Sequence, residues 1–119
     1  MESKSLELAK QFLGKPIKVI IDRKLGDKHP KWGWTYPVNY GYVPGVIAPD
    51  GEELDAYVLN VSTPMTEFAG TVIAIVHRTD NDDDKLIVVP TNDTISDEDI
   101  EKLVDFQEQY FKHNITRLP

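Results

Sequence analysis

Apolar and polar positions alternate along residues 17–22, which is typical of a β-strand with one buried face. This period of two predicts a strand that ends at Asp22. Further β-prone runs lie at residues 43–47, 54–61, 71–76 and 85–89. Because short turns join neighbouring runs, we expect hairpins and therefore an antiparallel sheet or a small barrel.

The period changes to that of a helix near both ends of the chain. Residues 3–13 carry an imperfect apolar stripe that stops at Gly14. Ser96 and the acidic residues after it are a typical helix start, and apolar residues follow at helical spacing up to Tyr110. The predicted fold is mainly β with flanking helices, in which a small antiparallel barrel is followed by a C-terminal helix.

Two of the predicted turns are strongly acidic. Pro49-Asp50-Gly51 is a signal for a tight turn, and it is followed at once by further carboxylates, Glu52, Glu53 and Asp55. The turn at residues 79–84 contributes Asp80, Asp82, Asp83 and Asp84. Carboxylates this close repel one another, so we expect a cation where the two turns meet at one mouth of a barrel. Oxygen ligands suit Mg²⁺, and Mn²⁺ can substitute for it.

A basic loop, residues 23–34, lies directly before the first acidic turn. It places Lys24, Lys28 and Lys31 among glycine and proline residues that are typical of turns. One interpretation is a loop that faces an anion, and the other is an ordinary exposed loop with aromatic anchors. The neighbouring acidic turn favours the first, because the rest of the chain is short of positive charge.

Composition narrows the classes of function. The chain has 119 residues, which suits one domain over residues 1–119, and its 40% apolar and 28% charged content is typical of a soluble globular protein. A net charge of −7 argues against nucleic acid as a partner, since that affinity relies on Lys and Arg. No apolar run reaches the roughly 20 residues that cross a bilayer. The start does not resemble a signal peptide, and cysteine is absent. We therefore expect a cytoplasmic protein with no membrane partner.

Several loop motifs with known chemistry are excluded. Asp80, Asp82 and Asp84 match the first ligands of an EF-hand loop, but Lys85 replaces the required glycine and Thr91 replaces the last glutamate. The chain has no P-loop, and no Ser-His-Asp or Cys-His set competes. Carboxylates that hold Mg²⁺, with Lys and Tyr nearby, are typical of phosphoryl transfer to water.

At residues 36–45 (YPVNYGYVPG) and 50–59 (DGEELDAYVL) the chain resembles the soluble (family I) inorganic pyrophosphatases. The signature of that family is Asp-x-Asp-Pro-φ-Asp, with φ apolar, after a Tyr-Pro-x-Asn-Tyr-Gly stretch. The resemblance continues through residues 79–90 and covers residues 17–112. It implies a five-stranded OB-like barrel with helices packed outside, in a shortened member of the family.

The resemblance also implies which residues hold divalent metals: Asp22, Asp50, Asp55, Asp80 and Asp83. Asp50 and Asp55 would bind the activating metals, and the pair from the second turn would bind those that arrive with pyrophosphate. Asp22 stands where the family has a glutamate at a strand end. Because the second turn is shorter than in the family, Asp82 and Asp84 remain alternatives to Asp83.

Catalytic and substrate contacts are implied in the same way. Glu52 stands where the family has the aspartate that acts as general base, and its longer side chain has to be re-aimed for proton transfer at about 3 Å. Tyr40 would hydrogen-bond near the nucleophile. The implied substrate-binding residues are Lys28, Lys31, Tyr36, Lys85, Tyr110 and Lys112.

The chain departs from the family at several positions. No arginine lies between Arg23 and Tyr36, where the hairpin that carries the family's phosphate-binding arginine is missing. Glu53 replaces a proline of the signature. Phe111 stands where a lysine is expected, with Lys112 one place later.

Three hypotheses for function remain open. The first is an inorganic diphosphatase, which hydrolyses pyrophosphate to two phosphates with a metal-bound hydroxide and depends on Mg²⁺. The second is a hydrolase of another phosphoanhydride on the same scaffold, because the missing hairpin could open the site to a larger substrate. The third is a metal- or phosphate-binding module without turnover, for which the change to Glu52 and the lost basic residues argue. Since the family is commonly oligomeric, a homo-oligomer is also an open expectation.

Overall fold

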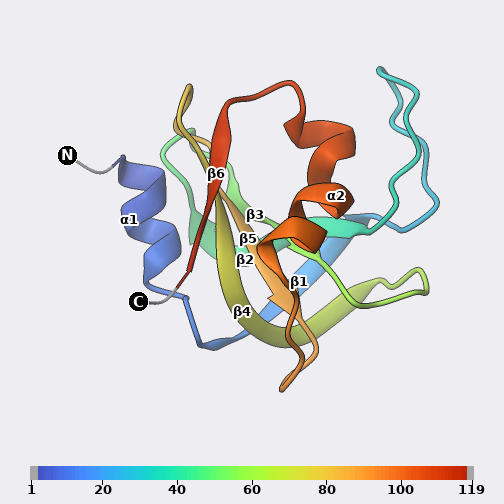
Figure 1. The fold of residues 1–119 in the computed structure, drawn as a ribbon, viewed down its shortest axis with the longest axis horizontal. Coiled ribbons are helices and arrows are strands. Elements are labelled where there is room, and N and C mark those ends of the chain that lie inside the picture. The colour runs from blue at the N-terminus through green and yellow to red at the C-terminus, as the bar shows by residue number, and fades with distance from the viewer. Residues whose placement is uncertain (1–2, 118–119) are drawn as a thin grey trace.

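Five strands close into a barrel in the computed structural model, which describes residues 3–117 (Figure 1). Within these residues the strand order is β1-β2-β3-β5-β4-β6, and an additional pairing of β1 with β4 closes the ring. The elements are α1 (Lys4–Lys10), β1 (Pro16–Arg23), β2 (Asn39–Ile47), β3 (Glu53–Val58), β4 (Glu67–Arg78), β5 (Lys85–Val89), α2 (Asp97–Glu108) and β6 (His113–Thr116).

The predicted five-stranded barrel with a C-terminal helix is confirmed, but two features of its topology differ from the expectation. β3 and β5 pair in parallel, because β4 passes to the far side of β5 before the chain turns back. A further strand, β6, follows α2 and pairs with the end of β4. Its sequence, HNIT, is too short and too polar to predict a strand. That residues 1–119 form a single domain stays a prediction.

The parallel pairing brings the two acidic turns to the same end of the barrel. Ala56 on β3 lies opposite Leu86 on β5, so the residues before them, Asp55 and Lys85, are neighbours across the two strands. The first acidic turn leads into β3 and the second leads into β5. Because neighbouring parallel strands begin at the same edge of a sheet, both turns lie at this edge.

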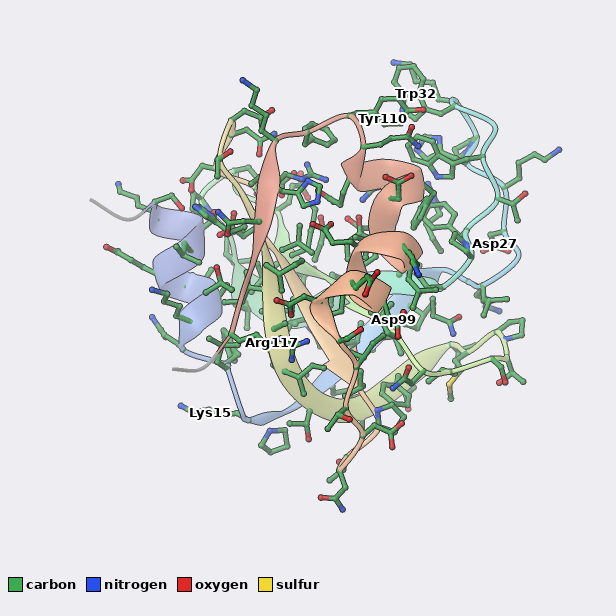
Figure 2. The ribbon with its side chains drawn as sticks, in the orientation of Figure 1. Lys15, Asp27, Trp32, Asp99, Tyr110 and Arg117 are labelled. Carbon is green, nitrogen blue, oxygen red and sulfur yellow. The ribbon has the colours of Figure 1, made fainter. Side chains whose placement is uncertain are left out.

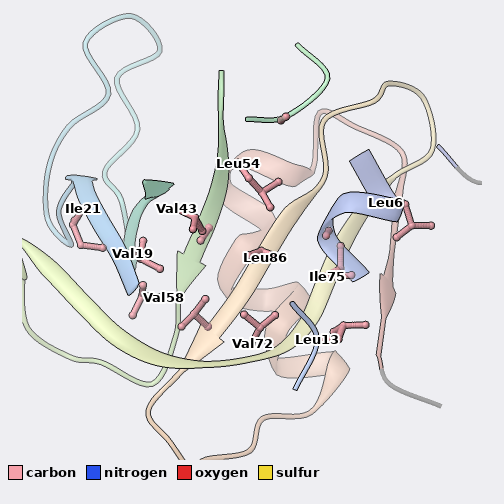
Figure 3. Packing of buried hydrophobic residues seen from close by; sticks show 14 residues of the cluster. Leu6, Leu13, Val19, Ile21, Val43, Leu54, Val58, Val72, Ile75 and Leu86 are labelled. Carbon is pink, nitrogen blue, oxygen red and sulfur yellow. The ribbon is translucent and has the colours of Figure 1, made fainter. Parts of the chain in front are cut away.

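Side chains of β5 are buried on both faces of the sheet. Leu86 and Val88 belong to an apolar cluster inside the barrel, against which α1 also packs (Figure 3). Ile87 and Val89 belong to a second cluster, under α2. Burial on both faces explains why β5 is an unbroken apolar run rather than an alternating one. The two helices therefore cover different sides of the barrel (Figure 1), and neither described helix is long and apolar enough to cross a membrane.

Asn39 and Gly41, from the YPVNYG stretch, have structural roles. A Cβ atom on Gly41 would lie 1.8 Å from the backbone oxygen of Ile20, so only glycine lets β1 and β2 approach this closely. The buried side chain of Asn39 accepts a hydrogen bond from the backbone N–H of Leu25 at 3.0 Å. This bond ties the start of the basic loop to the barrel.

Candidate active site

Two carboxylates and one ammonium group form the centre of a cavity at the mouth of the barrel. Lys85 Nζ donates to Asp55 Oδ2 at 2.6 Å and to Asp83 Oδ1 at 2.8 Å. The side chain of Lys85 is only 3% exposed, whereas those of Asp55 and Asp83 are 33% and 35% exposed. The lysine is therefore held inside, while both carboxylates remain open to a ligand.

The cavity has a volume of about 300 Å³ and lies between the barrel strands, α2 and the basic loop. Its lining includes His29, Tyr40, Asp55, Arg78, Asp83 and Lys85. Two cationic side chains, two carboxylates and a phenol therefore face one small space. This combination suits a small ligand that carries several negative charges and arrives with a cation.

Arg78, at the end of β4, is the second cation of the cavity. Its Nη1 donates to Asp83 Oδ2 at 3.2 Å, and its guanidinium carbon lies 3.7 Å from the centroid of the Phe111 ring. The same guanidinium makes a bidentate contact with Glu108, from Nε to Oε1 at 3.0 Å and from Nη2 to Oε2 at 2.8 Å. Glu108 is fully buried, so Arg78 is the charge that makes its burial tolerable.

Sequence reasoning missed the Arg78–Glu108 pair, although a signal was present. Glu108 follows Ile100 and Val104 at intervals of four residues, which places it on the buried face of the C-terminal helix. A carboxylate at a core position requires a buried cation or a proton. Only the folded chain shows that Arg78 is the partner, because the two residues come from elements that are separated in sequence.

Further polar contacts connect the Arg78–Glu108 pair to Asp55 through Tyr57, Gln107 and Tyr40. The hydroxyl of Tyr57 donates to Glu108 Oε2 at 2.7 Å, and Gln107 Nε2 donates to that hydroxyl at 2.7 Å. Tyr40 interacts with both Gln107 and Asp55. A ring of polar contacts thus joins four strands of the barrel to α2, and it fixes the directions of the side chains that face the cavity.

Burial, the charge of Asp55 and hydrogen bonding to Asp55 raise the pKa of Tyr40 well above its ordinary value. The single proton of the phenol is directed at the Asp55 carboxylate, so the two side chains are joined at the cavity wall.

The remaining carboxylates of the two acidic turns have local partners. Asp50 Oδ1 accepts from the Glu52 backbone N–H at 2.9 Å, and Asp80 Oδ2 accepts from the Lys112 backbone N–H at 3.0 Å. Asp82 Oδ1 accepts from the Ser5 backbone N–H at the start of α1. Asp84 is buried and contacts His77 and the Arg78 backbone N–H. These bonds explain part of the acidic cluster without a ligand.

The structure therefore brings only part of the expected metal set together. Asp55 and Asp83 share the cavity, and Asp22 lies close enough that loss of hydration and the charge of Asp55 raise the pKa of Asp22. Asp50, Asp80 and Glu52 are exposed and do not line the cavity. Within residues 3–117 no three acidic or histidine side chains converge closely enough to hold a metal by themselves.

The donor chemistry of the cavity nevertheless fits Mg²⁺. This ion usually keeps several waters and takes one or two carboxylates together with phosphate oxygens of a substrate. Asp55 and Asp83 supply two such carboxylates, and their shared contact with Lys85 shows that the space between them accepts positive charge.

Of the expected phosphate-binding residues, only Lys85 lines the cavity. Lys28, Lys31 and Lys112 are exposed, and Lys31 Nζ lies 4.8 Å from the centroid of the Trp32 ring. Tyr36 is buried beside His29 and Phe106. Tyr110 is 65% exposed and lies next to Trp34.

His29 is a second residue at the cavity that sequence reasoning missed. Its Nδ1 accepts from the backbone N–H groups of Lys31 and Trp32 at 3.1 and 3.0 Å. In the neutral ring the proton is therefore assigned to Nε2. A histidine in a loop of glycine, proline and lysine carries no pattern that distinguishes it from an exposed one.

Comparison with known proteins gives one family. A family model described as "Inorganic pyrophosphatase" matches residues 9–117. The inorganic pyrophosphatase of Brucella melitensis is 35% identical over 86 residues, which cover 66% of this chain and 49% of that protein. The inorganic pyrophosphatase of Pseudomonas aeruginosa is 37% identical over 86 residues, which cover 63% of this chain and 47% of that protein. The chain spans about half the length of the curated relatives it matches.

Solved structures agree with these relatives at the level of the fold. The crystal structure of inorganic pyrophosphatase from Ehrlichia chaffeensis superposes with a TM-score of 0.71 over 88% of this chain and 87% of that one. The sequence identity in this comparison is 19%, so the likeness concerns the barrel and its helices.

Proposed function

The chain belongs to the inorganic pyrophosphatase family, and from this premise we propose that it hydrolyses inorganic pyrophosphate to two phosphates. One observation carries the proposal: Asp55 and Asp83 share the Lys85 ammonium in a cavity that Arg78 and Tyr40 also line. Open carboxylates beside fixed cations suit a polyanion that binds together with a divalent cation. Because the chain spans about half the length of its curated relatives, their activity is a proposal here.

Asp55 and Asp83 would hold the divalent cation, Mg²⁺ or Mn²⁺, together with oxygens of the substrate. Such a cation, when bound, neutralises phosphate charge and lowers the pKa of water at its surface. Asp22 would support the site through its proximity to Asp55. Asp50 and Asp80 would contribute from the two turns, which lie at the same end of the barrel.

The choice of Asp83 among the three neighbouring aspartates has geometric support. Asp82 is engaged at the start of α1, and Asp84 is buried against His77. Asp83 alone of the three contacts the Lys85 ammonium that also contacts Asp55.

Lys85 and Arg78 would stabilise the negative charge that develops on the leaving phosphate. Glu108 and Asp83 accept three of the five N–H groups of the Arg78 guanidinium. Arg78 would thus supply, from β4, the guanidinium that the chain lacks between Arg23 and Tyr36. Fixed donors need no reorganisation as the charge develops, so they favour the transition state over the ground state.

Tyr40, which contacts Asp55, would hydrogen-bond near the attacking water. Glu52 would act as general base, which requires the first acidic turn to carry its carboxylate toward the cavity. The exposed side chains of Lys28, Lys31, Tyr110 and Lys112 would bind the outer phosphate oxygens. Tyr36 is buried and would act only by packing against His29.

Release of phosphate tests this proposal. Purified protein with Mg²⁺ should release phosphate from pyrophosphate, and Mn²⁺ should also support the reaction. Asp55→Asn should abolish it while the circular dichroism and urea unfolding stay those of a folded protein. Asp105→Asn, at an exposed position on α2, is the matched control and should keep full activity. No release with either ion would reject the proposal.

A second candidate is binding of a divalent cation and pyrophosphate without turnover. It is favoured by the position of Glu52, which is exposed and outside the cavity lining. Calorimetry that shows saturable pyrophosphate binding, in the absence of any phosphate release, would select this candidate. In either case we place the protein in the cytoplasm, and sedimentation would decide whether it is a homo-oligomer.

A further inference from the structure

An aromatic cleft lies directly beside the candidate active site. Trp32, Trp34, Tyr110 and Phe111 line a cavity of about 330 Å³. Trp32 and Tyr110 are 62% and 65% exposed, and they are two of the three large hydrophobic residues exposed within residues 3–117. Figure 2 shows both at the end of the molecule where the basic loop passes the C-terminal end of α2. Such gathered exposed aromatic surface is typical of a binding site.

The walls of this cleft are supported from behind. Trp34 makes edge contacts with Phe106 and Tyr36, at centroid distances of 5.9 and 6.4 Å. Trp34 and Tyr110 lie nearly parallel, with 18° between their planes. Trp34 Nε1 is the one buried side-chain polar atom in the described part of the chain without a hydrogen-bond partner. The indole N–H of Trp34 is therefore a donor that the described residues leave without an acceptor.

The cleft adjoins the carboxylate cavity. Trp32, Trp34 and Phe111 line both spaces, so the two lie side by side. One end is flat and apolar, and the other carries Asp55, Asp83 and Lys85. Lys31 adds a cation at the rim, where its ammonium lies over the Trp32 ring. Pyrophosphate has no apolar part and would use only one end.

We propose that the aromatic cleft is a nucleobase subsite, in which the base of a nucleoside triphosphate stacks on Trp32 and Tyr110. The terminal phosphates then reach the Asp55–Asp83 cavity, so the inference rests on the proposed function for its phosphate end. Stacking suits any nucleobase, because every base has an aromatic face. Each of the two cavities, about 330 and 300 Å³, is within the usual range of roughly 300–1,000 Å³ for small-molecule sites.

The test compares ligands that differ by the nucleoside. Binding of adenylyl imidodiphosphate, inorganic tripolyphosphate and imidodiphosphate is measured by calorimetry with Mg²⁺ present. A base that stacks on aromatic side chains should make the nucleotide bind about 5- to 150-fold more tightly than tripolyphosphate. Trp32→Ala should remove most of this difference, and Trp32→Phe should retain it. Because Trp32 also lines the carboxylate cavity, the nucleotide and tripolyphosphate affinities are compared as a ratio within each protein.

Ile47→Ala is the matched control, because Ile47 is 58% exposed but lies outside both cavities. It should change the affinity for none of the three ligands. Equal affinity for the nucleotide and tripolyphosphate would overturn the inference while leaving the proposed function intact, provided that imidodiphosphate binds. If none of the ligands binds and pyrophosphate is not cleaved, both proposals fail. A loss of self-association in Trp32→Ala, with no effect on the nucleotide, would identify the cleft as a contact between two copies and also overturn the inference.

Discussion

Removing the guanidinium of Arg78 is expected to destabilise the fold far more than removing a surface charge. In Arg78→Met the carboxylate of Glu108 stays fully buried and loses the two hydrogen bonds that Arg78 donates, while it keeps the one from Tyr57. Breaking a buried ion pair by removing one partner costs about 3–5 kcal/mol. This is a large part of the roughly 5–15 kcal/mol by which a domain is stable.

Urea unfolding followed by circular dichroism measures the effect. With a slope of about 2 kcal/mol per molar urea, the midpoint should fall by roughly 1.5–2.5 M. Lys18→Ala is the control, because it removes a 3.0 Å contact with Glu67 in which both side chains are 56% exposed. That change should cost at most about 1 kcal/mol.

The double variant Arg78→Met/Glu108→Leu distinguishes the effect of an unpaired buried charge from the effect of altered packing. It should recover most of the stability, because no unpaired charge stays buried. A single Arg78→Met protein that unfolds within about 0.5 M urea of the wild type would show that Glu108 tolerates burial without Arg78, contrary to this prediction. A double variant as unstable as the sum of its single changes would contradict the idea that the two residues act as a pair.

Two further predictions concern the framework of the site. Burial alone would lower the pKa of His113, but the Phe111 carbonyl, Glu101 and the charge of Glu108 together raise it. Protonated His113 therefore stabilises the fold fully below its ordinary pKa of about 6.5, and this stabilisation is lost as pH rises through the raised pKa. His113→Gln should lower the urea midpoint at pH 5.5 but hardly at pH 9. An equal loss at both pH values would contradict this. Gly41→Ala should lower the free energy of unfolding by about 3 kcal/mol or more, because the added Cβ would lie 1.8 Å from backbone. A urea midpoint like that of the wild type would show that β1 and β2 can separate without cost.

Much of the fold was predictable because its signals are local. The run at residues 85–89 coincides with β5, and Pro49-Asp50-Gly51 does lie in the turn between β2 and β3. Ser96 is the N-cap of α2 and accepts from the backbone N–H of Asp99. Each of these features depends on residues within a few positions of one another.

The features that were not predictable depend on contacts between distant segments. The parallel pairing of β3 with β5 follows from the path of β4. The unbroken apolar run of β5 indicates burial on both faces, but it does not identify the partner strand. The β6 strand is completed by its pairing with β4 rather than by its own sequence. Residues that are adjacent in sequence also need not share a site. Asp82 and Asp84 flank Asp83, but they contact Ser5 and His77 rather than Lys85.

The candidate site likewise contains some residues that the sequence predicts and others that only the fold identifies. The aspartates and Lys85 were found from the acidic turns and from the resemblance to a family. Arg78 and His29 were not found, because each is identified by the residues that surround it in the folded chain. The parallel register explains why the two acidic turns lie at one mouth: Asp55 and Lys85 precede residues that lie opposite each other.

The most direct test of the site is a crystal grown with Mn²⁺ and imidodiphosphate, with the anomalous signal of manganese recorded. The proposed site predicts at least one manganese peak within coordination distance of both Asp55 and Asp83, roughly 2.1 Å for a small hard cation. It also predicts phosphate oxygens within hydrogen-bonding distance of Lys85 and Arg78. Imidodiphosphate bound elsewhere, with Lys85 still joined to both carboxylates and no manganese between them, would contradict it.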